Sequence, residues 1–263
     1  MPKIITEDMI EQAAIKALQE RHNYTVLNCM TEEPDTLPDG TGRKDKKQVV
    51  LPDVMLESLC RINPDIPEQT VRTVVDELCH TPVSGDLMLT NYQNYQKIRN
   101  GITVEYNKNG KKTSNILRLL SYNDVLSNTF TVTSQMWIKG ETHWRRPDLI
   151  IFINGFPMIF IELKNSNIPV KNAYDINLKN YLKDIPYLFN YNQICVLSNG
   201  METRLGSFAA GYEFFFEWLK VENEKEKPDR KAIRENCTSL EYFIAGLCEP
   251  KNLLDYIENF ILY

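Results

Sequence analysis

The stretch RRPDLIIFINGFPMIFIELKNSN, residues 145–167, decides which fold this chain adopts. It contains two strongly apolar runs on either side of Asn154-Gly155, a dipeptide typical of tight β-hairpin turns. The pattern predicts two neighbouring strands that are buried on both faces, as in the centre of a sheet. Charged residues nevertheless stand at the strand ends, where Asp148 precedes the first strand and Glu162 and Lys164 close the second.

The faces of these strands determine whether the three charges meet. Side chains two positions apart in a strand share a face, so Glu162 and Lys164 point the same way. Met158 and Phe160 are expected on that face too. A two-residue loop would place Asp148 on the opposite face, whereas a three-residue loop or a bulge would place it opposite Glu162. We expect the odd loop or the bulge.

In that register, the two carboxyl groups form a candidate metal site. Their Cβ atoms would lie about 5 Å apart, close enough for repulsion to raise one pKa. Oxygen ligands from Asp148, Glu162 and a backbone carbonyl such as that of Leu163 suit Mg²⁺. Such a cation acidifies a bound water and neutralises charge on a phosphate, while Lys164 orients that water or stabilises the charge. The alternative is an ordinary solvent-facing Glu-x-Lys ion pair, which is worth about 0–1 kcal/mol.

The flanking sequence predicts an α/β architecture. Helical spacing of apolar residues runs through 6–21, 51–100 and 171–189, and β-rich runs cover 102–120, 128–140 and 193–200. This order predicts one mixed sheet with helices on both faces. Residues 30–47, rich in Pro, Gly, Asp and Lys, are expected to be a mobile loop. The runs 239–247 and 250–263 are expected to form two terminal helices, or a helix and a strand.

The composition limits the classes of function that this chain can have. The 263 residues are 43% hydrophobic and 25% charged, which is ordinary for a globular protein. Six scattered cysteines and three separated histidines lack metal-binding spacing, and no run is apolar enough to cross a membrane, so we expect reduced thiols in a cytoplasmic protein. Neither GxxxxGK[ST] nor GxGxxG occurs, so this chain alone is not expected to hydrolyse ATP.

The charge pattern gives a weak indication of nucleic-acid binding. The net charge of −5 does not favour it, although local basic patches matter more than totals. Arg145 and Arg146 form one such patch, and Lys111 and Lys112 in the 108–112 turn form another. They are candidate contacts to a DNA backbone, and the alternative for each patch is a solvated loop.

The segment RPDLIIFINGFPMIFIELKN closely resembles the nuclease core of the restriction (R) subunit of type I restriction–modification enzymes. That family belongs to the PD-(D/E)xK nucleases, whose signature reads here as Pro147-Asp148 and Glu162-Leu163-Lys164. The resemblance continues through YLKDIPYLFNYNQICVLSNG and METRLGSFAA, and IEQAAIKALQERHNY looks like the opening helix of the family. It implies a restriction-endonuclease-like fold in which Asp148 and Glu162 bind the metal and Lys164 is the catalytic lysine.

The resemblance also implies supporting residues. Glu11 would be the acidic residue placed near the metal, with a helix-surface charge as its alternative interpretation. The family shows Gln-x-x-x-Tyr on the helix after the core, and this chain has Asn177 and Tyr181 there, with the glutamine shortened. Their i,i+4 spacing puts both on one helical face. Tyr181 fits the apolar stripe of that helix equally well, as a core residue.

By this resemblance, residues 1–220 form a PD-(D/E)xK endonuclease domain with a helical insertion at about 51–100, and 221–263 leads towards an ATP-dependent motor. The implied activity is that of a type I site-specific deoxyribonuclease, which cleaves double-stranded DNA without sequence preference at the cut. Mg²⁺ is the expected cofactor, with Mn²⁺ able to substitute, and ATP serves only the full-length subunit. Modification and specificity subunits are the expected partners. Two alternatives stay open: a non-catalytic module that docks the motor onto those subunits, and a nuclease of the same fold acting on RNA or branched DNA.

Overall fold

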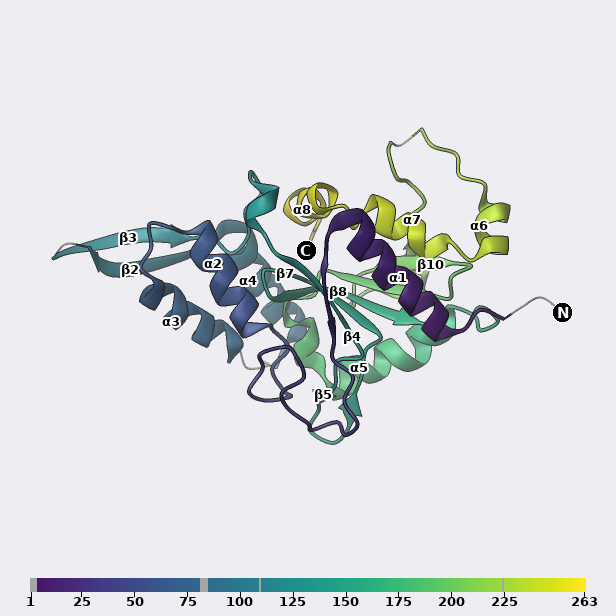
Figure 1. The fold of residues 1–263 in the computed structure, drawn as a ribbon, viewed down its shortest axis with the longest axis horizontal. Helices are drawn as coiled ribbons and strands as arrows, with labels where there is room; N and C mark the ends of the chain where they lie inside the picture. The colour runs from purple at the N-terminus through teal and green to yellow at the C-terminus, as the bar shows by residue number, and fades with distance from the viewer. Residues whose placement is uncertain (1–3, 81–84, 109, 224) are drawn as a thin grey trace.

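The structure is a computed structural model that describes residues 4–80, 85–108, 110–223 and 225–263 (Figure 1). Its α-helices are α1 (Glu7–His22), α2 (Pro52–Ile62), α3 (Glu68–Cys79), α4 (Leu87–Asn100), α5 (Lys179–Asp184), α6 (Arg230–Asn236), α7 (Ser239–Gly246) and α8 (Pro250–Asn259). Its strands are β1 (Thr25–Asn28), β2 (Ile102–Lys108), β3 (Lys111–Leu117), β4 (Phe130–Ser134), β5 (Ile138–Lys139), β6 (Trp144–Arg145), β7 (Leu149–Ile153), β8 (Phe156–Leu163), β9 (Ile194–Ser198), β10 (Thr203–Gly206) and β11 (Phe216–Glu217). Short 3₁₀ turns, η1 (Val125–Ser127), η3 (Pro186–Asn190) and η4 (Tyr212–Phe214), and a π-helix, η2 (Ala173–Leu178), complete the described elements.

A mixed sheet forms the centre of the fold. In the described part of the chain it has seven strands in the order β1-β4-β7-β8-β9-β10-β11. β1 runs parallel to β4, and β8 runs parallel to β9, whereas β7 is antiparallel to both β4 and β8. The two apolar strands of the sequence, β7 and β8, are buried along their whole length. The predicted α/β class is confirmed, and the arrangement is consistent with a restriction-endonuclease-like fold.

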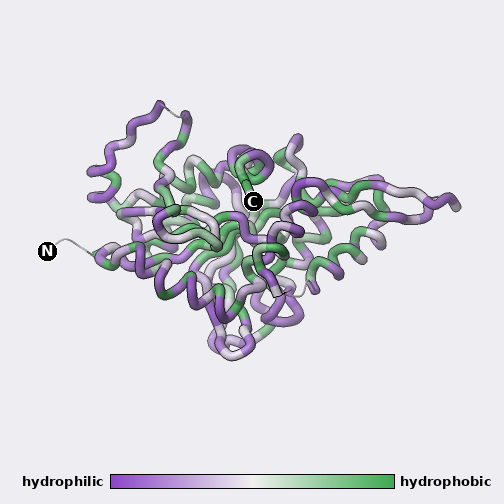
Figure 2. The backbone as a smooth tube through the Cα atoms, turned by 180° about the vertical axis from the view of Figure 1, so that it is seen from behind, coloured by the Kyte–Doolittle hydropathy of each residue, from purple (hydrophilic) through white to green (hydrophobic). Residues whose placement is uncertain are grey.

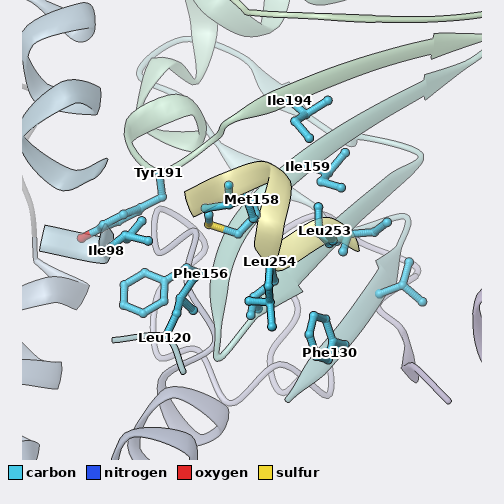
Figure 3. Close-up of a cluster of buried hydrophobic side chains, with 14 of the residues drawn as sticks. Ile98, Leu120, Phe130, Phe156, Met158, Ile159, Tyr191, Ile194, Leu253 and Leu254 are labelled. Carbon is cyan, nitrogen blue, oxygen red and sulfur yellow. The ribbon is translucent and has the colours of Figure 1, made fainter. Parts of the chain in front are cut away.

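The sheet is covered on both faces by separate hydrophobic clusters. One cluster joins the sheet to α1, α7 and α8, and the other joins it to η2, α5 and η3. Figure 3 shows part of the first, where Leu253 and Leu254 of α8 lie among Phe130, Met158 and Ile159 of the sheet. The hydropathy of the chain follows the same plan, with apolar strands inside and polar loops outside (Figure 2). Of the two alternatives for the last segments, the pair of terminal helices is confirmed, and α7 packs against α1.

A helical region and a long hairpin extend from the sheet on one side. The helices predicted within 51–100 are confirmed as α2, α3 and α4, while residues 81–84 lie outside the described residues. The predicted hairpin is confirmed as β2 and β3, which pair from Ile102 with Leu117 to Lys108 with Lys111. Its turn residue 109 also lies outside the described residues. The hairpin projects at the far left of Figure 1, away from the sheet.

The loop between β1 and α2 contains a buried cluster of charges. The Asp39 carboxylate accepts hydrogen bonds from Arg43 and from Lys46 Nζ, the latter at 2.8 Å, and the three side chains are at most 3% exposed. Arg43 also donates to the Trp137 carbonyl oxygen at 3.1 Å, and the Lys139 N–H donates to the Lys46 carbonyl oxygen at 3.1 Å. The expectation of a mobile loop is therefore wrong for residues 39–46, because buried ion pairs fix this part to the β5–β6 hairpin.

Within the described residues, no helix combines the length and the apolar character that crossing a membrane requires.

Candidate active site at the β7–β8 strand ends

The β7–β8 hairpin contains the predicted irregularity. Asn154 and Gly155 form a two-residue turn and both have positive φ, 51° and 82°, as such turns require. The pairing register then shifts next to the Phe152–Pro157 pair, where Met158 is left as an extra residue on β8. This is a β-bulge, which adds one residue to one strand and reverses the faces of the residues beyond it.

The bulge brings the two carboxylates to the same face. The register that follows it places Asp148, one residue before β7, opposite Glu162. Ile150 and Phe160, their neighbours on that face, belong to one buried cluster. The predicted register is thus confirmed through a bulge and not through a three-residue loop. Met158 belongs to the cluster on the other face, so its predicted place beside Glu162 is wrong, because the bulge lies at Met158 itself.

Two donors hold the half-buried Asp148 carboxylate. The Leu163 N–H donates to Oδ2 at 2.7 Å, and Gln135 Nε2 lies 3.5 Å from Oδ1. Burial raises the pKa of Asp148, while the hydrogen bond from Leu163 opposes that shift. The carboxylate is therefore fixed in orientation by the strand that carries Glu162.

Glu162 is a buried carboxylate with one oxygen unsatisfied. It is 2% exposed, its Oε1 accepts a hydrogen bond from Lys164 Nζ at 2.9 Å, and its Oε2 has no hydrogen-bond partner among the described residues. The pKa of Glu162 is raised to about 8, mainly by burial and also by the nearby Asp148, against the lowering effect of Lys164 and of the Tyr181 hydroxyl. A buried acceptor without a partner is costly, so Oε2 is an atom that a proton or a cation would stabilise.

Lys164 joins the oxygens of the strand end. Its Nζ donates to the Leu163 carbonyl oxygen at 2.6 Å as well as to Glu162, and its side chain is 14% exposed. Its backbone N–H donates to the Ser198 carbonyl oxygen at 2.8 Å, which ties the end of β8 to β9. The ammonium thus lies against the Leu163 carbonyl oxygen, which is expected to face a metal, and against the Glu162 oxygen that is not assigned to the metal.

Glu11 reaches the site from α1 through another side chain. It is 6% exposed, and its Oε2 accepts a hydrogen bond from Gln135 Nε2. The pKa of Glu11 is raised to about 7, mainly by burial and also by the charge of Asp148, against the lowering effect of the hydrogen bond from Gln135. Across the described ranges, no three His, Cys, Asp or Glu side chains form a common metal-binding group. A direct metal-ligand role for Glu11 stays a prediction.

The residues predicted to support the site lie beside it. Tyr181 is buried, packs edge-to-face on Phe160 with ring centroids 5.3 Å apart, and donates a hydrogen bond to the Arg146 carbonyl oxygen at 3.2 Å. Burial, the charge of Glu162 and the interaction of the Tyr181 hydroxyl with that carboxylate raise the pKa of Tyr181, and the interaction with Asn177 lowers it. Tyr181 is therefore both a core residue and an anchor for the segment that leads into Asp148. Asn177 belongs to the π-helix η2, and such irregular turns occur often at functional sites.

The two adjacent arginines have different surroundings. Arg145 Nε donates to Asp184 Oδ2 at 2.7 Å, so this guanidinium is already paired. The Arg146 guanidinium lies 4.9 Å from the centre of the Trp137 ring and lowers the pKa of Glu11 through its charge, but within the described residues it forms no ion pair of 4.0 Å or less. Arg146 is therefore the arginine available to an external phosphate.

The hairpin lysines are not part of this site. Lys111 and Lys112 lie at the outer end of β2–β3, and Lys112 Nζ pairs with Glu105 at 2.7 Å. The site lies next to the start of α1, where the Ser166 N–H donates to the Ile5 carbonyl oxygen at 2.9 Å. The hairpin and the start of α1 are at opposite ends of the long axis of the molecule (Figure 1). These lysines therefore do not touch the carboxylates of the candidate site, and a contact between them and a DNA backbone stays a prediction.

Sequence reasoning missed Gln135. It follows the strand FTVTS at the end of β4, and it contacts both Glu11 and Asp148. A single amide after a strand carries no spacing signal, so only the three-dimensional contacts identify it.

The residues present fit a hard divalent cation. Asp148, the unpartnered Oε2 of Glu162 and the carbonyl oxygen of Leu163 supply only oxygen donors, which is the set that Mg²⁺ and Mn²⁺ favour. A cation there would also satisfy the buried oxygen that the described residues leave without a partner.

Comparison with known proteins identifies the family. The family model described as type I restriction enzyme R protein N terminus matches residues 4–237. The type I restriction enzyme HindI endonuclease subunit of Haemophilus influenzae is 33% identical over 269 residues, which are 99% of this chain and 24% of that protein. The putative type I restriction enzyme MjaIXP endonuclease subunit of Methanocaldococcus jannaschii is 28% identical over 277 residues, 99% of this chain and 26% of that protein. The chain thus spans about a quarter of the length of these curated relatives. It belongs to the family of the N-terminal regions of type I restriction enzyme R proteins.

Proposed function

We propose that this chain is a Mg²⁺-dependent endonuclease domain that cleaves double-stranded DNA without sequence preference of its own. The observation that carries the proposal is the buried Glu162 Oε2 without a partner, opposite Asp148 and beside Lys164. Membership of the R-protein family and relatives named as endonuclease subunits support the same assignment. A purely docking role would leave this arrangement of buried charges without an explanation.

Each side chain of the site would have its own role in hydrolysis. A bound divalent cation would supply Lewis acidity and an acidified water. Asp148 and Glu162 would hold that cation, with Asp148 kept in place by the Leu163 N–H at 2.7 Å. Lys164, whose ammonium is held at 2.9 Å from Glu162, is placed to stabilise negative charge that develops on the phosphate.

Arg146 is the basic group proposed to position the DNA. Its guanidinium stacks on Trp137, and Arg146 precedes Asp148 by two positions in the sequence. Contacts to the phosphate backbone fix the position of a duplex without reading its sequence. Sequence recognition would therefore belong to other components, which we propose are the modification and specificity subunits of a restriction complex. Consumption of ATP would belong to a motor in the longer subunit.

Nicking of long DNA by the reassembled complex tests this proposal. Wild type should cut in the presence of Mg²⁺ and Mn²⁺, and Asp148→Ala should not cut, while ATP hydrolysis continues in both. Asp65→Ala is a matched control, because its carboxylate is 86% exposed and remote from the site. Cutting by Asp148→Ala at the wild-type rate would refute the assignment.

A further inference from the structure

Gln135 has an unusual backbone conformation directly beside the candidate site. Its φ is +55°, in the left-handed region that residues with a Cβ rarely adopt. Among the described residues, the other non-glycine cases are Asn23 and Cys237, which end helices, and Asn154, which lies in the hairpin turn. Those are usual places for such a conformation. Gln135 ends no helix and lies in no two-residue turn, so its strain needs another reason.

The conformation occurs where one hairpin ends and another begins. Ser134 pairs with Leu149, and the Gln135 N–H donates to the Asp148 carbonyl oxygen at 3.0 Å. Beyond this point the chain starts a new ladder, in which Ile138 pairs with Arg145. The backbone of Gln135 is thereby fixed to the residue that carries the first carboxylate.

The side chain of Gln135 connects two acidic groups from distant parts of the sequence. Its Nε2 donates to Glu11 Oε2 on α1 and lies 3.5 Å from Asp148 Oδ1 at the start of β7. A primary amide has two N–H donors on one nitrogen, so it can serve two carboxylates at once. Because it carries no charge, it orients them without cancelling the negative potential that attracts a cation, as a lysine would.

We propose that Gln135 is a positioning residue of the metal site: its strained backbone places a neutral double donor between Glu11 and Asp148 and fixes α1 relative to the strand ends. This inference rests on the proposed function, because it concerns the same cation. Residues that orient metal ligands through hydrogen bonds typically change metal affinity by about 10- to 100-fold when replaced. Replacing Gln135 should therefore change the free energy of cation binding more than it changes the free energy of unfolding.

Two substitutions separate positioning from a structural role. Gln135→Met keeps the length of the side chain and removes both donors. Gln135→Gly removes the same donors and also relieves the left-handed backbone, so its Tm should match or exceed that of Gln135→Met. Asn23→Gly is the matched control, since it relieves a similar φ of +57° at the far end of α1.

The test is a calorimetric titration of the 263-residue chain with Mn²⁺. Thermal melts of each variant in chelator accompany it. Both Gln135 variants should bind Mn²⁺ at least about 10-fold more weakly, and Asn23→Gly should bind like wild type. The Tm of Gln135→Gly should match or exceed that of Gln135→Met. If wild type binds Mn²⁺, Asp148→Asn does not and both Gln135 variants bind like wild type, the positioning role is overturned while the proposed function stands. A Tm for Gln135→Gly several degrees below that of Gln135→Met would also overturn it, because the backbone of Gln135 would then not be strained. If wild type and Asp148→Asn bind Mn²⁺ equally, the metal site itself is overturned.

Discussion

Asp148 and Glu162 face each other because β8 contains one residue more than its partner strand over the same length. The register shift at Met158 moves Glu162 onto the face of Asp148. In an uninterrupted two-residue hairpin, the alternation of side chains would place the two carboxylates on opposite faces. The site is thus created by a backbone irregularity that concentrates negative charge in a buried position. That charge must be relieved by a proton or by a cation.

The first prediction concerns the stability of the metal-free chain as a function of pH. Glu162 has a pKa of about 8 in the folded protein against 4.5 for an ordinary glutamate. The folded state keeps a proton that the unfolded state loses, so the free energy of unfolding should fall as pH rises from about 4.5 to about 8. In Glu162→Gln this contribution is absent. The free energy of unfolding of the variant minus that of wild type should therefore be larger at pH 8.5 than at pH 5, by on the order of 1–3 kcal/mol.

Urea denaturation in chelator at the two pH values measures this difference. Glu57→Gln is the control, since its side chain is 81% exposed and lies away from the site. Parallel pH profiles for wild type and Glu162→Gln would contradict the burial argument.

The second prediction concerns stabilisation by Mg²⁺. A cation and a proton compete for the same carboxylate, and burial raises the pKa of Glu162 to about 8. Mg²⁺ at tenfold its Kd should therefore raise Tm by about 2–4 °C at pH 8.5 and by much less at pH 5.5. Thermal melts with and without Mg²⁺ at each pH provide the measurement. An equal shift at both pH values, or an equal shift in Asp148→Asn, would show that Mg²⁺ acts elsewhere.

The fold could be predicted from the sequence to the level of class and central strands. Three of its features are local in the sequence: the apolar runs of β7 and β8, the Asn154-Gly155 turn and the charges at the strand ends. Such features can be recognised without knowledge of the tertiary contacts. The place of the bulge could not be predicted, because Met158 is as apolar as its neighbours and either face of the sheet accepts it.

The parts of the site that depend on contacts between distant segments were not predictable. The pairing of Arg145 with Asp184 joins residues 39 positions apart, and the contact of Gln135 with Glu11 joins residues 124 positions apart. Similarly, a sequence that is rich in lysine at 108–112 does not reveal that the β2–β3 hairpin projects away from the sheet. Only the arrangement in space separates Arg146 from these other basic residues.

The third prediction separates the two arginines. Arg146→Ala should weaken DNA binding by a similar factor for all sequences and reduce the slope of log affinity against log salt by about 1. Arg145→Ala should instead lower stability by about 1 kcal/mol, because it removes the principal partner of Asp184. Fluorescence anisotropy with a labelled duplex at several salt concentrations, and thermal melts, distinguish the two effects. Because Lys112 is paired with Glu105, Lys112→Ala should change the salt slope less than Arg146→Ala does. A salt slope altered by Lys112→Ala but not by Arg146→Ala would reverse the assignment.

The fourth prediction concerns Lys164. Its ammonium contacts Glu162 Oε1 and the Leu163 carbonyl oxygen. Lys164→Met should reduce cleavage by the reassembled complex by about 10²- to 10³-fold, the loss typical of one electrostatic donor in an active site. Binding of Mn²⁺ should be retained or tightened, because a positive charge next to the ion is removed. Loss of Mn²⁺ binding with unchanged cleavage per bound ion would assign Lys164 to cation binding alone.

The most direct test of the central claim is the anomalous scattering of Mn²⁺ in crystals of this chain soaked at millimolar concentration. We predict one strong peak in contact with the carboxylates of Asp148 and Glu162, and none in Asp148→Asn crystals treated identically. Wild-type crystals with no peak between these two residues, or with their carboxylates on opposite faces of the sheet, would contradict it.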